Sequence, residues 1–149
     1  MAHSKNKVWI HGVFSTKYRK PLISKSIQSQ VWEMLCANLR KVGCHPEIVG
    51  GVEDHIHVLF LLNRETTVSK AFQQMKGATT REINKMNLIG EYFSWQVGYA
   101  AFSVSESKVP VVIRYIKNQE EHHKKKNFQQ ELKFLIEGHG MIYEPQDLD

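Results

Sequence analysis

Two histidines separated by a single residue, His55 and His57, stand at the start of an apolar stretch of the sequence. Residues two apart in a β-strand point to the same face, so a strand would place both imidazoles side by side. Both faces of residues 56–62 are largely apolar, as in a central strand that is covered on both sides. Buried imidazoles are costly unless they are paired or bound, and two neighbouring ones can share a metal ion. The pair therefore indicates a metal site, with chance spacing among eight histidines as the alternative.

A second pair of residues, Tyr115 and Gln119, is spaced four apart and would share one face of a helix. The Gln119 carbonyl oxygen can bind a metal, and a metal with open positions polarises a phosphodiester. A phenol has a pKa of about 10, and a nearby cation stabilises its phenolate for attack on phosphorus. The resulting phosphotyrosine would keep the bond energy for rejoining, which suits cutting and resealing DNA without ATP. A packing tyrosine and a solvated glutamine are the alternatives.

The elements that must position these residues follow from hydrophobic periodicity. We expect strands over residues 8–19, 46–52, 56–62 and 93–105, and helices over 24–42, 66–86, 109–125 and 128–137. The order β-α-β-β-α-β predicts an α+β, ferredoxin-like antiparallel sheet with helices on one face, followed by a C-terminal helix that bears Tyr115. The Gly50-Gly51 pair predicts a bulge or a close backbone approach. No repeat or linker divides the chain, so residues 1–149 are expected to form one domain.

Composition narrows the class of protein. The chain has 149 residues, 42% of them hydrophobic, and a net charge of +5. Basic residues concentrate in residues 1–20 and 108–126, which suggests a polyanionic partner. No apolar run approaches the ~20 residues of a membrane helix, and no secretory signal is visible at the N-terminus. Together with only two cysteines, Cys36 and Cys44, this predicts a cytoplasmic protein without a membrane partner.

These residues carry a family resemblance. His55-Ile56-His57 matches the His-hydrophobic-His (HUH) motif, and with Tyr115-Ile-Lys-Asn-Gln119 it resembles the single-tyrosine HUH transposases of the insertion-sequence 200/605 family. The resemblance extends over nearly the whole chain, through the segments 13–21, 76–81, 95–104, 118–123 and 137–140. It identifies residues 1–149 as a single HUH transposase domain.

The resemblance implies an RNA-recognition-motif-like sheet and a metal-dependent DNA strand transferase. Such an enzyme cleaves and rejoins single-stranded DNA at insertion-sequence ends through a 5′-phosphotyrosine intermediate. It implies His55, His57 and Gln119 as ligands of Mg²⁺, Tyr115 as the nucleophile, and DNA hairpins at the element ends as partners. Imidazole ligands also favour Mn²⁺. Our candidates for DNA contacts are the basic residues Lys17, Arg19, Lys76 and Arg81.

The resemblance also implies a homodimer in which the tyrosine helix of one subunit can complete the histidine site of the other. Gly98 and the polar residues 103–108 precede that helix and would let it cross, so we expect the tyrosine to act in trans. Two other functions stay open. One is a domesticated relative that processes repeat hairpins, which only the DNA flanking the gene would distinguish. The other is a non-catalytic module that binds single-stranded nucleic acid, which would not need the histidine pair or Tyr115.

Overall fold

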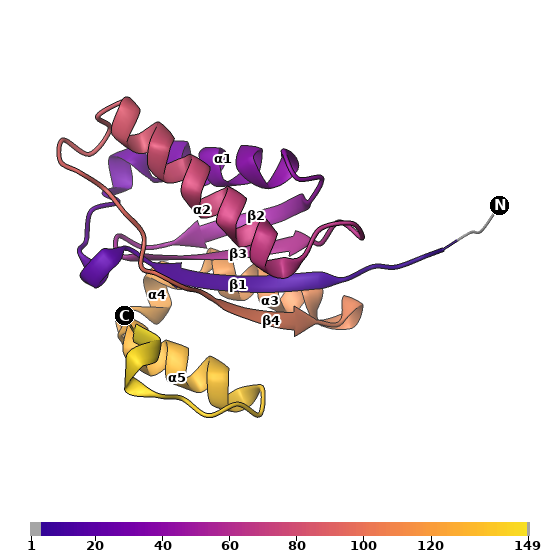
Figure 1. The fold of residues 1–149 in the computed structure, drawn as a ribbon. Helices are drawn as coiled ribbons and strands as arrows, with labels where there is room; N and C mark the ends of the chain where they lie inside the picture. The colour runs from indigo at the N-terminus through magenta and orange to yellow at the C-terminus, as the bar shows by residue number, and fades with distance from the viewer. Residues whose placement is uncertain (1–3, 149) are drawn as a thin grey trace.

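A four-stranded antiparallel sheet forms the centre of the computed structural model, which describes residues 4–148. The strands are β1 (Trp9–Ser15), β2 (His45–Gly51), β3 (His55–Leu61) and β4 (Ala100–Val104), in the order β2-β3-β1-β4 (Figure 1). The connection from β1 to β2 leaves room for β3 between them, which is the split βαβ arrangement. The predicted ferredoxin-like α+β fold is confirmed.

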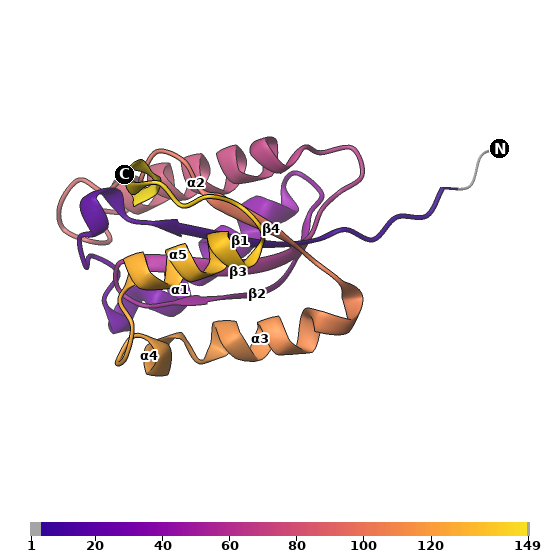
Figure 2. The same cartoon turned by 90° about the horizontal axis from the view of Figure 1, so that it is seen from below.

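Helices cover both faces of the sheet. The helices α1 (Lys25–Arg40) and α2 (Val68–Lys85) lie on one face, and α3 (Val109–Lys117), α4 (Gln119–His122) and α5 (Phe128–Gly138) lie on the other (Figures 1 and 2). Three short 3-10 turns complete the chain: η1 (Lys17–Arg19), η2 (Glu106–Lys108) and η3 (Pro145–Leu148). Within residues 4–148, every helix is too short or too polar to cross a membrane.

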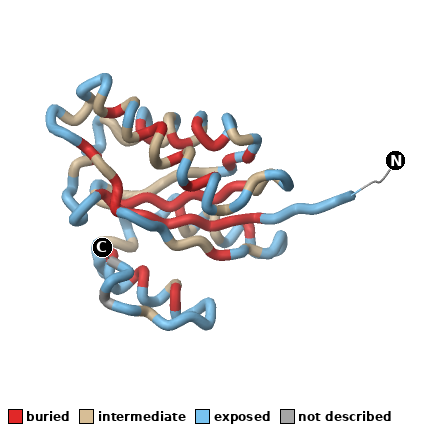
Figure 3. The backbone as a smooth tube through the Cα atoms, viewed as in Figure 1, coloured by how far each residue is buried: buried red, intermediate tan, exposed pale blue. Residues whose placement is uncertain are grey.

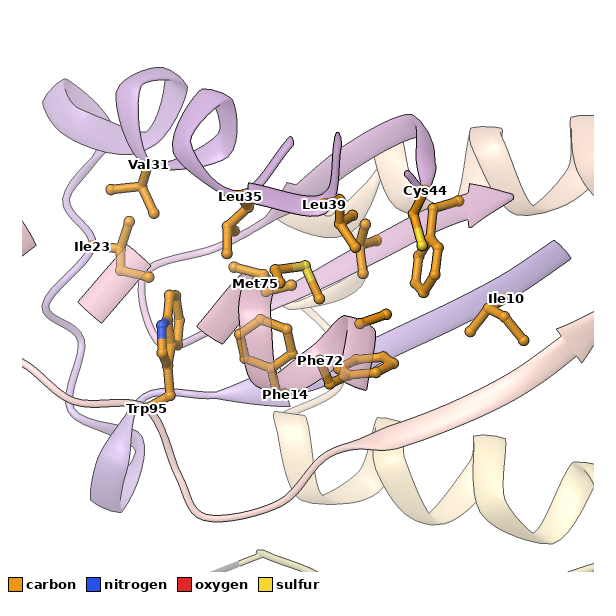
Figure 4. Packing of buried hydrophobic residues seen from close by; sticks show 14 of the residues in the cluster. Ile10, Phe14, Ile23, Val31, Leu35, Leu39, Cys44, Phe72, Met75 and Trp95 are labelled. Carbon is orange, nitrogen blue, oxygen red and sulfur yellow. The ribbon is translucent and has the colours of Figure 1, made fainter. Parts of the chain in front are cut away.

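Alternation along β3 divides its side chains between the two faces. Ile56, Val58 and Phe60 are buried in the apolar cluster beneath α1 and α2, whose packing is seen in Figure 4. The alternate residues of the strand, which include His55 and His57, point to the face covered by α3, α4 and α5. Burial on both faces makes β3 one of the most enclosed segments of the molecule (Figure 3). The predicted central strand is therefore present, and it carries the histidine pair into the interior.

Two predicted strands are shorter than expected. The first ends at Ser15, because Tyr18 and Arg19 adopt left-handed backbone angles, with φ of 57° and 54°, that no strand accommodates. In the segment predicted as a strand over 93–105, only residues 100–104 pair with β1 as a ladder. Trp95 forms a single bridge to Thr16 instead. Both changes shorten the sheet at the end where His55 lies, so this end is bounded by turns.

Candidate active site

The histidine pair is fully buried at one end of β3. His55 and His57 are both 0% exposed, so each imidazole depends on partners within the protein. The Nδ1 atom of His57 lies 2.9 Å from Nε2 of His11 on the neighbouring strand β1. The Nδ1 atom of His55 lies 2.7 Å from a carboxylate oxygen of Asp54. Both rings are thus oriented through Nδ1. Their Nε2 atoms face the helices that cover this side of the sheet.

Tyr115 reaches the histidines because α3 packs closely on the sheet. The contact is at Gly50, where an added Cβ would lie 2.9 Å from both the side chain and the carbonyl oxygen of Ile116. The predicted close backbone approach at the Gly50-Gly51 pair is therefore present. It brings Tyr115, the neighbour of Ile116, edge-on to His57 with ring centroids 5.5 Å apart. One chain thus supplies both the histidine pair and the tyrosine.

The helix predicted over residues 109–125 is broken at Asn118. This residue leaves the helical region, with φ of −96° and ψ of 21°, and separates α3 from the single turn of α4. The break turns Gln119 inward, where it is 1% exposed. Its Oε1 atom lies 3.3 Å from Nε2 of His55 and 3.2 Å from Nε2 of His123. The His123 side chain is only 13% exposed and belongs to the site as well.

Glu131 is the central residue of the site, and the sequence analysis did not find it. Its Oε1 atom lies 2.9 Å from Nε2 of His57, 3.3 Å from Nε2 of His55 and 3.1 Å from Nε2 of His123. Its other oxygen accepts a short hydrogen bond from the Tyr115 hydroxyl. A carboxylate therefore accompanies the histidine pair, in addition to the Gln119 oxygen that the family resemblance implies as a ligand.

The local sequence explains how Glu131 is held and how it could have been noticed. Asn127 and Gln130 form a reciprocal capping box that begins α5 and places Glu131 in its first turn. Phe128, Leu132 and Ile136 form the buried stripe of this helix. Glu131 lies on that stripe, three residues after Phe128, and is only 2% exposed. A carboxylate on the apolar face of an amphipathic helix was the signal.

Burial and charge act against each other throughout the cluster. Burial disfavours the charged form of Glu131, but hydrogen bonds from the three imidazoles outweigh it and hold its pKa well below the usual range. Burial likewise opposes the imidazolium of His55, yet Asp54 and Glu131 raise its pKa. For His57 burial prevails and lowers the pKa. Burial and the neighbouring Glu131 carboxylate raise the pKa of Tyr115, so its hydroxyl keeps its proton.

The donor set fits a divalent cation. His55, His57 and Glu131 offer ligand atoms that all lie within 4.8 Å of one another. An ion with bonds of about 2.1 Å to adjacent octahedral ligands separates those ligands by about 3.0 Å. The separations of 2.9 and 3.3 Å between Glu131 Oε1 and the two Nε2 atoms are close to that value. An anionic carboxylate beside two imidazole nitrogens could therefore close around one cation.

The four residues predicted to contact DNA lie apart from this cluster. Lys17 and Arg19 are exposed in η1, beyond the end of β1, and Arg81 is exposed on α2. Lys76, also on α2, donates a hydrogen bond to the carbonyl of Gln96 at 2.8 Å and another to that of Gly98. Burial lowers the pKa of Lys76 to about 8. The structure therefore gives Lys76 a local role in holding residues 96–98, while the assignment to DNA of all four residues stays a prediction.

Comparison of the sequence with known protein families identifies the family of the chain. Residues 4–119 match the family described as Transposase IS200 like. The chain belongs to this family of IS200-like transposases. The match ends at Gln119, so the helix that supplies Glu131 to the transposase lies beyond it. No curated protein gives a match.

Two solved structures share the fold of this transposase. One, from Deinococcus radiodurans and assigned as a transposase, has a TM-score of 0.63 and 20% identity, covering 80% of this chain and 98% of the other. The second is a REP-associated tyrosine transposase bound to a REP hairpin. It has a TM-score of 0.56 and 16% identity, covering 83% of this chain and 74% of the other. At these identities the likeness concerns the fold.

Proposed function

We propose that this transposase cleaves and rejoins single-stranded DNA, with Tyr115 as the nucleophile and a divalent cation that polarises the scissile phosphate. The observation that supports the proposal is that one carboxylate contacts both parts of the site. Glu131 Oε2 accepts a hydrogen bond from the Tyr115 hydroxyl, and Glu131 Oε1 lies among the histidine Nε2 atoms. A phenol held at a cation site is what phosphodiester attack requires, since the phenol is a weak nucleophile alone. A protein that only bound DNA would have no use for this arrangement.

The proposed reaction exchanges one phosphodiester for another. The Tyr115 oxygen attacks the phosphorus and forms a bond to the 5′ phosphate, while the bond from phosphorus to the 3′ oxygen breaks. Glu131 Oε2 orients the phenol by accepting its hydrogen bond, and the phenolic proton is released to water. The departing oxygen becomes a 3′-hydroxyl by taking a proton from water. In rejoining, a 3′-hydroxyl attacks the phosphotyrosine and the Tyr115 oxygen leaves. No bond energy is lost to hydrolysis, so no ATP is needed.

We propose that His55, His57 and Glu131 hold the cation, with Gln119 Oε1 as a further oxygen at the same site. A bound divalent ion would polarise the scissile phosphate and neutralise charge that develops on its oxygens. Magnesium and manganese both suit a set of imidazole and oxygen donors. With Nδ1–H of His55 donating to Asp54 and Nδ1–H of His57 donating to His11, Nε2 of both histidines would stay available as a ligand.

We propose further that the tyrosine acts in cis, in place of the trans arrangement expected from the resemblance. The support is that Tyr115 lies against His57 and Glu131 of its own chain. Chains carrying Tyr115→Phe and His57→Ala, co-expressed with different tags and purified together, should then stay inactive. Cleavage recovered in that mixed preparation would instead show that α3 is exchanged between subunits.

The substrate class we propose is single-stranded DNA that folds into hairpins. A protein of similar fold, the REP-associated tyrosine transposase, is bound to a REP hairpin, which supports this choice. The exposed basic residues Lys17, Arg19 and Arg81 would contact its phosphates. Whether the hairpins belong to a mobile element or to genomic repeats follows from sequencing both flanks of the gene.

The decisive experiment replaces Tyr115 by phenylalanine. Labelled single strands from the flanks of the gene are incubated with protein and Mg²⁺, and covalent adducts are separated on a denaturing gel. Tyr115→Phe should lose at least about 10⁴-fold in cleavage while binding survives, because only the nucleophilic oxygen is removed. Tyr92→Phe, at a tyrosine that is 79% exposed, is the matched control and should retain full activity. An adduct formed at the normal rate by Tyr115→Phe would refute the proposal.

A further inference from the structure

A cleft of about 550 Å³ opens beside the nucleophile, between α3 and α4 on one side and α5 on the other. These are the three helices in front of the sheet in Figure 2. The inner end of the cleft is formed by Tyr115 and Glu131, and its outer walls include His122, Lys125, Lys126 and Phe134. We call it the Phe134 cleft. It is the space from which a substrate strand would approach the Tyr115 hydroxyl.

Phe134 is exposed in a way that the fold does not explain. It is 63% exposed on α5, whereas Phe128 on the same helix is 4% exposed and packs in the core. The ammonium of Lys126 lies 4.5 Å from the centre of the Phe134 ring. An exposed ring beside a cation is what proteins offer to a nucleobase, whose flat face stacks on the ring while the cation meets the phosphate.

The charges on the cleft walls favour an anion. Lys125 and Lys126 are exposed, and the one acidic residue on the outer wall, Glu121, is paired with Lys124 at 2.9 Å. His122 lies against the nucleophile, with its ring centroid 4.6 Å from that of Tyr115. A DNA strand lying in the cleft could therefore place one phosphate near Lys125 and Lys126 and the next phosphate near Tyr115.

We propose that the Phe134 cleft binds the nucleotide next to the scissile phosphate, with its base stacked on Phe134 and its phosphate held by Lys125 and Lys126. The inference rests on the proposed function and adds a substrate contact to it. Stacking accepts any base, so this subsite contributes affinity and alignment more than sequence preference. It also gives α5 a second role, since the helix that supplies Glu131 would support the substrate strand as well.

The test measures binding in the Tyr115→Phe protein, in which no cleavage interferes. Two fluorescein-labelled 20-nucleotide strands are compared by anisotropy: one of thymidine and one in which every base is absent. Adding Phe134→Ala should weaken binding of the thymidine strand about tenfold and leave the abasic strand nearly unchanged. Phe134→Tyr should restore the difference between the strands. Tyr92→Ala, which removes an exposed ring elsewhere, should change neither.

Changing both Lys125 and Lys126 to glutamine should weaken the two strands alike. The slope of log affinity against log salt concentration should fall by about 1.4, because about 0.7 is contributed by each phosphate contact to a single strand. An unchanged slope would overturn the phosphate contacts.

The outcomes separate the subsite from the function on which it rests. Two results would overturn the subsite alone. Phe134→Ala could leave the affinity for the thymidine strand unchanged, or it could lower the affinity for the thymidine and abasic strands equally. Failure of the Tyr115→Phe protein to bind either strand counts against the proposed function as well. If Phe134→Ala instead lowers the mass of the protein in solution and leaves DNA binding intact, the Phe134 face binds a second copy of the chain, and the subsite is wrong.

Discussion

The two faces of the sheet are built from the same strands and have opposite chemistry. Under α1 and α2 the face is one continuous apolar cluster, which includes Phe14, Phe60 and Phe72. Under α3, α4 and α5 the apolar contacts are split into two smaller clusters, one around Phe102 and one around Leu59. The five buried polar side chains of the site also lie on this face: His11, His55, His57, Gln119 and Glu131.

The difference teaches how a small domain can bury a reactive site without losing its fold. Buried polar groups are tolerated when each has a partner, and the hydrogen bonds of the histidine cluster supply those partners. Among residues 4–148, the buried side-chain atoms that lack a partner belong to Asn38, Trp95 and Tyr143, outside this cluster. Stability is thus concentrated on one face, and chemistry on the other.

After the loss of the Tyr115 hydroxyl, the largest expected effect comes from removing a histidine on the polar face. His57→Ala should reduce DNA cleavage by at least about 10³-fold, because it removes a cation ligand, and EDTA should do the same to the unmodified protein. The measurement is the cleavage rate on labelled strands at saturating Mg²⁺. His45→Ala, at an exposed histidine on β2, should cleave normally. Full activity in EDTA would contradict the role of the cation and would leave the histidines with a structural role.

A comparable loss on the apolar face should appear in stability instead. Phe72 is fully buried and contacts Phe14, Phe60 and Tyr99, so Phe72→Ala should lower the free energy of unfolding by about 3–5 kcal/mol. For a chain of this size this corresponds to a decrease in Tm of roughly 6–20 °C, which calorimetry measures. Well below the new Tm, cleavage per folded molecule should be unchanged. A loss of cleavage in the folded variant would show that the two faces are coupled.

A smaller effect should distinguish the two candidates for the third ligand. Glu131→Gln removes the charge but keeps the shape, and should weaken Mn²⁺ binding about 10- to 100-fold, as measured by calorimetric titration. Gln119→Ala removes an uncharged oxygen and should weaken it less. The reverse order would assign the third position to Gln119, as the family resemblance implies, and would leave Glu131 as the partner of Tyr115.

The sequence by itself determined the elements whose residues are close along the chain. Alternation is a local property, so the position of β3, the shared face of its two histidines and the order of strands and helices followed from residue types. The break at Asn118 was missed, because residues 117–125 are all polar and offer no apolar period from which a helix boundary could be read. The left-handed turn at Tyr18 was missed for a related reason, since residue types alone predicted a continuing strand there.

Only the tertiary structure decided which distant residues meet. Glu131 is 74 residues from His57 along the chain, and no spacing rule connects an acidic residue of one helix to a histidine on a strand. Their contact depends on the close packing of α3 at Gly50, on the turn at Asn118 and on the capping box that begins α5. Each of these is a local feature, but the 2.9 Å between carboxylate and imidazole results from their sum in three dimensions.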